Sequence, residues 1–397
     1  MKSDLESNSY YKQTGLEIPY NWDLNLLDDL GELNKEDDTQ LPVAEVYASD
    51  KYSLTGSGRG GNSLAAREED YKIYIEKAHQ NGIKFIFLWN AISMGGEEWH
   101  GQIQKKLYSQ ARKLVDSGVD CIIVAIPLLA LKLKTWFPDL EVACSVNSKI
   151  DSVEKVRQLI NHLNIDRLTL DHRCSRNFTL IKAIHREFTV PLAVLVNESC
   201  LPDCILQPHH QEYLATISRG SAVINNPPDL CHALCGIAKL SNPAYTLKAP
   251  WIRPEDVHYL IAAGVSYVKL AGRTQSSDWI LKMARAYAKG KFNGDIWQFI
   301  EKSGLTSPEW NIYLSRKLEP CHYKVTNELL DGFIVPFVNG QVPCVQTTIG
   351  CNDCTWCDQW MHAVSFPSNA QERINDLKEI LALIKDKNGP MTFCDAS

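Results

Sequence analysis

Four cysteines in the middle of the chain have the residue type and spacing of metal ligands. They form two C-x3-C pairs: Cys200 and Cys204 in NESCLPDC, and Cys231 and Cys235 in CHALC. Cysteine thiolates are soft ligands that select zinc, copper(I) or iron–sulfur clusters, and two close pairs supply the four ligands that such sites need. We therefore expect the fold to bring the two pairs together around one metal centre.

A second group of cysteines lies near the C-terminus, in CVQTTIGCNDCTWC. Its members are Cys344, Cys351, Cys354 and Cys357. The C-x2-C-x2-C part matches the start of the bacterial ferredoxin pattern, but position 361, where that pattern continues with cysteine, is Met361. Cys344 or a more distant residue would have to be the fourth ligand. This group predicts a second cluster or a zinc site, and an unliganded group is the alternative.

The elements that must position the two C-x3-C pairs follow a regular alternating pattern from residue 42 to about residue 290. Short apolar runs rich in β-branched residues alternate with amphipathic stretches of helix length. The expected strands are 43–48, 84–90, 121–127, 141–146, 167–171, 191–197, 221–225 and 267–272. Eight strands, each followed by a helix or turn, predict a (β/α)8 barrel of the α/β class. An open doubly wound sheet is the alternative, but no G-x-G-x-x-G follows the first strand.

Three regions follow from this pattern. Residues 1–40 are polar and acidic and are expected to form a lead-in segment, and residues 41–292 form the barrel that carries the first cysteine group. Residues 293–397 form an extension with the second cysteine group and a terminal helix over 370–389, whose apolar face we expect to pack the extension onto the barrel.

Function in a barrel collects at the carboxyl ends of the strands, and polar residues are frequent there. Asn90 and Asn197 end strands, Arg59 lies in the glycine-rich loop TGSGRGGN, and Arg253 and Arg273 flank the last strand. The three arginines, together with Lys269, would suit a carboxylate or phosphate, although pairing with structural carboxylates is the alternative. We predict Arg59, Asn90, Asn197, Arg253 and Arg273 as substrate-binding residues.

The candidates for acid–base chemistry are His209, His210 and Lys269. The two histidines follow the first cysteine pair by about one helical turn, and imidazole titrates near neutral pH. Lys269 alternates with apolar neighbours in the last strand and is expected to point into the barrel. Packing or helix capping is the alternative role for each histidine.

The position of the cysteines favours an iron–sulfur cluster over zinc. Structural zinc sites usually lie in small closed modules, whereas both pairs are expected at the barrel mouth, after the strands over 191–197 and 221–225. A radical-SAM enzyme would have a further cysteine at position 207, where Gln207 stands, and the spacing is not that of ferredoxins. Zinc and four unliganded cysteines remain the alternatives.

Composition limits the class of protein. The 397 residues include 13 cysteines and carry a formal net charge of −6 without long basic runs, so extended binding of nucleic acid is not favoured. The start of the sequence has no apolar signal region, and no apolar stretch has the length of a membrane helix. We expect a cytoplasmic protein in a reducing compartment, where clustered cysteines bind metal more often than they form disulfides.

Several segments resemble the collagenase-like peptidase family U thirty-two, which includes the YhbU-, UbiU- and UbiV-type proteins. They are NESCLPDCILQPHH, CHALC, LKAPWIRPEDVHYLIAAGVSYVKLAGRT and WILKMARAYAKGKFNGDI, with GSGRGGN and FLWNA as weaker matches. The resemblance implies a barrel that holds a 4Fe-4S cluster on Cys200, Cys204, Cys231 and Cys235. It also implies oxygen-independent hydroxylation of a small molecule, an RNA base or a peptide, with prephenate as the oxygen donor in some members.

Two other functions remain open at this point. The chain could be a non-catalytic iron–sulfur subunit that pairs with a related subunit or a redox partner, or it could be a peptidase that acts on a peptide substrate. No H-E-x-x-H, G-x-S-x-G or evident cysteine-protease pattern occurs in the sequence. We therefore expect an iron–sulfur enzyme of the oxidoreductase type.

Overall fold

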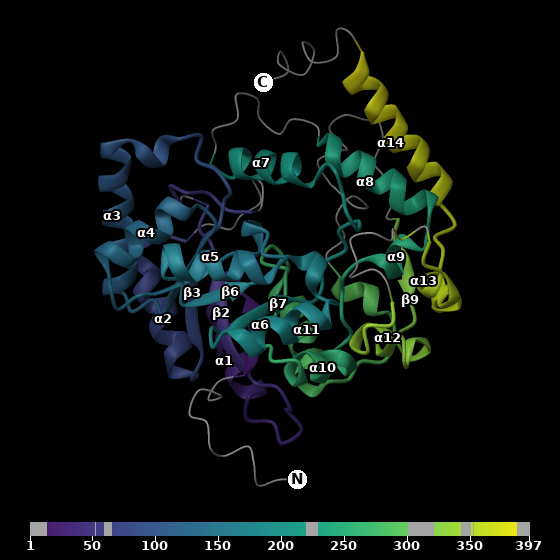
Figure 1. Cartoon of the computed structure of the whole chain (residues 1–397), viewed down its shortest axis with the longest axis horizontal. Helices are drawn as coiled ribbons and strands as arrows, with labels where there is room; N and C mark the ends of the chain where they lie inside the picture. The colour runs from purple at the N-terminus through teal and green to yellow at the C-terminus, as the bar shows by residue number, and fades with distance from the viewer. Residues whose placement is uncertain are drawn as a thin grey trace.

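The computed structural model describes residues 14–51, 53–58, 66–219, 229–300, 321–342, 351 and 353–386. Eight parallel strands form a closed barrel (Figure 1), which confirms the predicted (β/α)8 fold class. Each strand pairs with the next one along the chain, and β1 pairs with β8 to close the ring. The strands are β1 (Gly15–Pro19), β2 (Val43–Ala48), β3 (Lys84–Trp89), β4 (Cys121–Val124), β5 (Glu141–Cys144), β6 (Arg167–Thr169), β7 (Leu192–Leu195) and β8 (Tyr267–Lys269).

The first strand corrects the prediction of a lead-in segment over residues 1–40. Residues 15–19 form β1 and residues 24–33 form α1, so the barrel begins well before residue 41. The stretch GLEIP is short and has a charged residue at its centre, and it therefore lacks the apolar run that marks the other strands. Glu17 is nevertheless completely buried, because Lys269 of β8 pairs with its carboxylate inside the barrel.

The expected strand over 221–225 lies outside the described residues. The barrel closes without it, because β7 pairs directly with β8 through Ala193 and Tyr267, Val194 and Val268, and Leu195 and Lys269. The eighth strand of the barrel is thus supplied by β1.

Helices surround the barrel, and local sequence explains where several of them begin and end (Figure 1). In α5, for example, the Ser152 side chain accepts a hydrogen bond from the backbone of Lys155, and Asn164 adopts the left-handed conformation that ends the helix. Amphipathic stretches of the sequence over 63–82, 104–118 and 151–164 overlap α2, α3 and α5. The helices from α1 to α11 are α1 (Leu24–Leu33), α2 (Tyr71–Gln80), α3 (Gly101–Asp116), α4 (Pro127–Trp136), α5 (Val153–Leu163), α6 (Phe178–Glu187), α7 (Gln207–Ser218), α8 (Leu230–Ser241), α9 (Tyr245–Lys248), α10 (Val257–Ala262) and α11 (Ser277–Lys289).

A buried ion pair lies near the amino-terminal end of the barrel interior. Arg167, at the start of β6, donates a hydrogen bond of 2.6 Å to Glu45 of β2, and it lies 3.3 Å from Glu141. Its guanidinium also stacks over the ring of Tyr267, 4.5 Å from the centroid. Because Arg167 and Glu45 are both inaccessible to water, each charge depends on the other for compensation.

The C-terminal extension contains the two-stranded antiparallel sheet of β9 (Lys324–Val325) and β10 (Val364–Ser365), with α12 (Val335–Val338), α13 (Trp356–Gln359) and α14 (Ala370–Lys385). The terminal helix α14 packs against α8, and Ile374, Leu377 and Leu381 on its apolar face are buried. Figure 1 shows the two helices side by side. None of the helices in the described residues is long and apolar enough to cross a membrane.

Candidate functional site

The first cysteine pair lies in the loop after β7, at the carboxyl end of the barrel. Cys200 and Cys204 stand between Leu195, which ends β7, and Gln207, which begins α7. Loops after the strands form the active site in (β/α)8 enzymes. Both cysteines are free and half-buried, so their thiols are available as ligands.

The second pair lies on α8, and the strand that the sequence predicts before it, over 221–225, lies outside the described residues. Cys231 and Cys235 are one helical turn apart, so both thiols lie on the same face of the helix. Asp229 begins the helix, and its side chain accepts a hydrogen bond of 3.0 Å from the backbone N–H of His232. This cap fixes the first turn of α8, which carries Cys231.

Electrostatic interactions connect the thiols of the two pairs, because Cys235 acts on Cys200 and Cys204 acts on Cys231 and Cys235. Burial, together with the charges of Asp229, Cys204 and Cys235, raises the pKa of Cys231 to about 11. Burial also raises the pKa of Cys200, with Glu198 and Cys235 as additional causes. Thiols with raised pKa values keep their protons at neutral pH unless a cation replaces the protons.

Two lysines place positive charge beside these thiols. Lys239, one turn after Cys235 on α8, is buried and donates a hydrogen bond of 3.1 Å to Ser199 Oγ. Its charge opposes the rise in pKa of both Cys200 and Cys235. Lys149 also acts on Cys200, and among the described residues its buried Nζ has no hydrogen-bond partner. Both ammonium groups would balance the negative charge of bound thiolates.

A buried histidine adjoins this group after β6. His172 Nε2 lies 2.8 Å from Nε2 of Gln207, and this contact fits an amide that donates to an uncharged ring nitrogen. Burial, together with the charge of Lys149, lowers the pKa of His172 to about 4. His172 is therefore neutral at physiological pH.

Replacing His172 by Gln is expected to weaken the dependence of the free energy of unfolding on pH. An unfolded histidine binds a proton below about pH 6.5, whereas folded His172 stays neutral down to about pH 4, so the wild type should lose about 3 kcal/mol of unfolding free energy across this range. The free energy of unfolding begins to fall when the pH drops below the pKa that histidine has in the unfolded chain. Urea unfolding between about pH 4 and 7 measures it, with exposed His162→Gln as control; an equally steep loss in His172→Gln would contradict the assignment.

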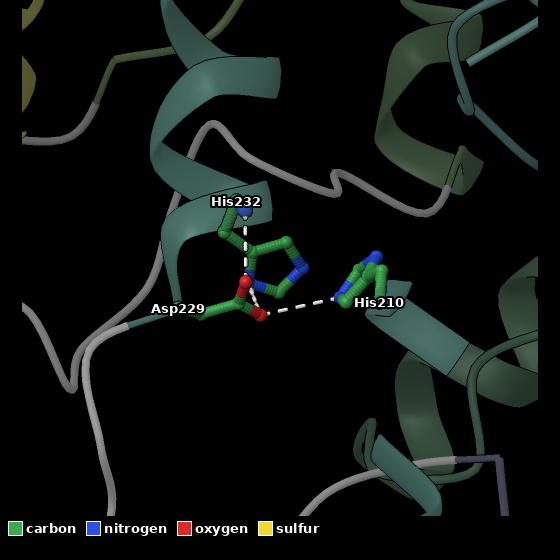
Figure 2. Close-up of side chains that lie close together, drawn as sticks. All are labelled: His210, Asp229 and His232. Atoms are coloured by element: carbon green, nitrogen blue, oxygen red, sulfur yellow. Dashed lines mark hydrogen bonds and ion pairs between the residues drawn. The ribbon is translucent and has the colours of Figure 1, made fainter. Parts of the chain in front are cut away.

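Of the two predicted catalytic histidines, His210 joins a cluster and His209 is exposed. His210 Nε2 lies 3.2 Å from Asp229 Oδ2, and His232 Nδ1 lies 3.2 Å from the same oxygen. Burial alone would raise the pKa of the Asp229 carboxyl, but the two imidazoles hold that pKa below its usual value. Figure 2 shows the three side chains turned toward one another.

Two predicted substrate-binding residues have structural partners instead. Asn197 is fully buried; its amide donates to the carbonyl oxygens of Ala271 and Phe299 at 2.9 and 3.0 Å, and its own oxygen accepts from Ala271 N–H. Arg253 pairs with Asp256 at 2.8 Å and with Asp331 at 3.0 Å. These contacts join the barrel to the residues after it, so the structure does not support a substrate role for either side chain.

The other predicted cations divide into two cases. Lys269 and Arg273 converge on the ring of Tyr47: Lys269 Nζ is 3.9 Å from the centroid and the Arg273 guanidinium carbon is 5.9 Å from it. Burial, followed by repulsion from Arg273, holds the pKa of Lys269 well below its usual range. Lys269 thus points into the barrel as expected, and its catalytic role stays a prediction. Arg59 lies outside the described residues.

Asn90 takes part in a chain of amides at the barrel mouth. Its side-chain oxygen accepts from the Gly58 backbone at 3.1 Å, and its carbonyl oxygen accepts from the Asn147 amide at 2.8 Å. Gln211 of α7 continues the chain by donating to Asn147 at 3.1 Å. Asn90 therefore links the glycine-rich loop to the mouth, and its role in binding substrate stays a prediction.

The second cysteine group lies near the loop of the first. Burial raises the pKa values of Cys351 and Cys357, and Cys354 contributes to both rises, while Asp203 and Lys248 also act on Cys351. Asp203 stands directly before Cys204, so the two cysteine groups approach each other. Cys344 lies outside the described residues, and the identity of a fourth ligand stays open to experiment.

Sequence reasoning missed Lys149, Lys239, Asp229 and His232. Lys239 stands in the apolar stretch LCHALCGIAKLS, four residues after Cys235, and that helical spacing was the available signal. Asp229 and His232 form a D-x-x-H pattern at the start of a helix, which is also the spacing of an N-cap. Their approach to His210 depends on the packing of α7 against α8, and no short sequence pattern predicts that packing.

Comparisons with known proteins agree with the family suggested by the sequence. Residues 57–201 match the model of peptidase family U32. A relative from Methanocaldococcus jannaschii, described as an uncharacterized protease, is 25% identical over 314 residues, which are 78% of this chain and 87% of that protein. The predicted resemblance is thereby confirmed.

Two solved structures are similar to parts of the chain. The structure of a U32 peptidase covers 60% of this chain and 88% of that chain, with 18% identity and a TM-score of 0.44. A glycerol uptake operon antiterminator-related protein from Thermotoga maritima covers 51% of this chain and 91% of that chain, with 11% identity and a TM-score of 0.27.

Proposed function

Because residues 57–201 match the model of peptidase family U32 and a relative described as an uncharacterized protease is 25% identical, we propose that this chain is an iron–sulfur enzyme with a 4Fe-4S cluster at the barrel mouth. The cluster ligands would be Cys200, Cys204, Cys231 and Cys235. The reaction is an oxygen-independent modification, of the hydroxylation type, of a small molecule, an RNA base or a peptide. Prephenate is the oxygen donor that the family resemblance suggests.

One observation carries this proposal: four half-buried thiols from the β7–α7 loop and from α8, none of them in a disulfide, lie within electrostatic range of one another. Four thiolates from two pairs are the ligand set of a 4Fe-4S cluster.

The chain's own residues suit an anionic, electron-carrying group. When bound, the cluster supplies one-electron redox chemistry. Lys239 and Lys149 place positive charge beside the thiolates, and Ser199 holds the Lys239 ammonium group in position. Because the thiols are half-buried and not enclosed, a substrate can approach them from the mouth, which favours an enzyme over a subunit with an enclosed cluster.

The experiment is to purify the full chain without oxygen and to assay iron, acid-labile sulfide and zinc. We expect roughly four irons and four sulfides for each occupied cluster, together with a paramagnetic signal after reduction. Exposure to air should bleach the visible absorption. Zinc without sulfide in the same preparation would overturn the proposal.

Peptide hydrolysis is the second candidate function. It is favoured by the family match and by the M. jannaschii relative, which is described as an uncharacterized protease. Assays of the cluster-loaded protein against unfolded protein substrates test it directly, because a peptidase releases new amino termini.

A further inference from the structure

His210, Asp229 and His232 form a compact set of ligand atoms outside the cysteine group. Figure 2 shows His210 on α7 facing Asp229 and His232 at the start of α8. Among the described residues, this is the only set of three His, Cys, Asp or Glu side chains whose ligand atoms lie within 4.8 Å of one another. Two helices that are separated along the chain thus present two ring nitrogens and one carboxylate oxygen to the same small volume.

The distances match those of a coordination site. Each ring nitrogen lies 3.2 Å from Asp229 Oδ2. Ligands held 2.0–2.1 Å from a tetrahedral zinc ion are separated by about 3.3–3.4 Å along each edge. The three side chains therefore need only small movements to surround one ion.

Hydrogen bonding alone does not account for the arrangement. His210 Nε2 is buried and has no hydrogen-bond partner in the described part of the chain, although it lies 3.2 Å from the carboxylate. A buried ring nitrogen that faces a carboxylate without a well-aligned hydrogen bond is costly, and a metal ion bound between the nitrogen and the carboxylate would remove that cost.

We propose that His210, Asp229 and His232 bind one divalent first-row metal ion, with zinc as the representative ion. Two neutral imidazoles and one carboxylate are the ligand set of hydrolytic zinc sites, which keep a further position for water or substrate. The side chains of the three residues are 20%, 12% and 27% exposed, so that position can face solvent. The site is distinct from the cysteine ligands and does not depend on the proposed cluster.

The test uses the full chain, purified without oxygen so that the cysteines keep any cluster. After dialysis against a chelator, the protein is incubated with one equivalent of zinc chloride, separated from free zinc and analysed for metal content. Zinc-edge X-ray absorption then identifies the ligands. We expect one bound zinc with nitrogen and oxygen neighbours at about 2.0–2.2 Å and no sulfur shell at about 2.3 Å.

Variants locate the ion. His210→Ala should weaken zinc binding by more than about 100-fold, because loss of a direct ligand exceeds the effect of losing an outer partner. Asp229→Asn should also weaken binding while it keeps a side-chain oxygen to cap α8, so a folding defect is avoided. His209→Ala is the matched control, because the neighbouring His209 is exposed, and it should bind zinc as the wild type does.

Three results would overturn the proposal: a wild type that retains no zinc, zinc with sulfur neighbours, or unchanged binding in His210→Ala. Circular dichroism of each variant establishes that it is folded. Iron and sulfide are measured in the same samples, so failure of the cluster proposal and failure of the zinc site appear as separate readings.

Discussion

Replacing Cys204 and Cys231 together by alanine is expected to abolish the iron–sulfur signal of the barrel mouth. One ligand is then missing from the β7–α7 loop and one from α8, and two thiolates do not retain a cluster that needs four. Iron and sulfide content, visible absorption and the paramagnetic signal of the reduced protein measure the loss. The iron content should fall by the amount of one cluster.

Cys321→Ala is the control for this experiment, because Cys321 is a buried free cysteine that belongs to neither group. It should keep all of the iron. Any signal from Cys351, Cys354 and Cys357 should also survive the double substitution. Loss of both signals would mean that the two groups, which approach each other near Asp203, share ligands, and full retention of iron would contradict the proposed ligand set.

Replacing Arg167 by Met should lower the free energy of unfolding by about 3–5 kcal/mol, because Glu45 would keep a buried charge without its partner. Removing the second charge as well, in Glu45→Leu with Arg167→Met, should recover most of the loss, since apolar residues of similar size often replace a buried ion pair without cost. Urea unfolding of the two variants and the wild type measures both effects.

The pair lies at the amino-terminal end of the barrel, whereas the first cysteine group lies at the carboxyl end. We therefore expect folded Arg167→Met to keep the iron content of the wild type. A single variant as stable as the wild type would show that Glu45 is protonated or solvated after the change. A double variant no more stable than the single one would show that Arg167 acts through its packing on Tyr267.

Apolar patterning was enough to predict most of the fold. Seven of the eight barrel strands coincide with predicted strands, because buried parallel strands are nearly continuous apolar runs. The exception, β1, contains Glu17, and its burial depends on Lys269 of the neighbouring strand β8, which is 252 residues away along the chain. A pattern read within a short window cannot include a partner at that distance.

The sequence was enough to predict the cysteines of the candidate site, but it was not enough to predict the charged residues around them. Spacing alone pointed to Cys200, Cys204, Cys231 and Cys235. The surrounding charges depend on three-dimensional packing: Lys239 reaches Ser199 only because α8 lies over the β7–α7 loop. For the same reason Arg253, which looked like a free cation in the sequence, is held by Asp256 and Asp331.

The pairing of β1 with β8 also sets the order in which the molecule can form. Glu17 and Lys269 are 252 residues apart, so a chain emerging from the ribosome exposes β1 long before its partner exists. Until β8 arrives, both edges of the growing sheet have unpaired backbone groups that can join a neighbouring chain. Closure is a long-range event with a high entropic cost, which makes folding slow. The loops that carry Cys200, Cys204, Cys231 and Cys235 all precede β8, so every barrel-mouth thiol has been synthesised while the barrel is still open.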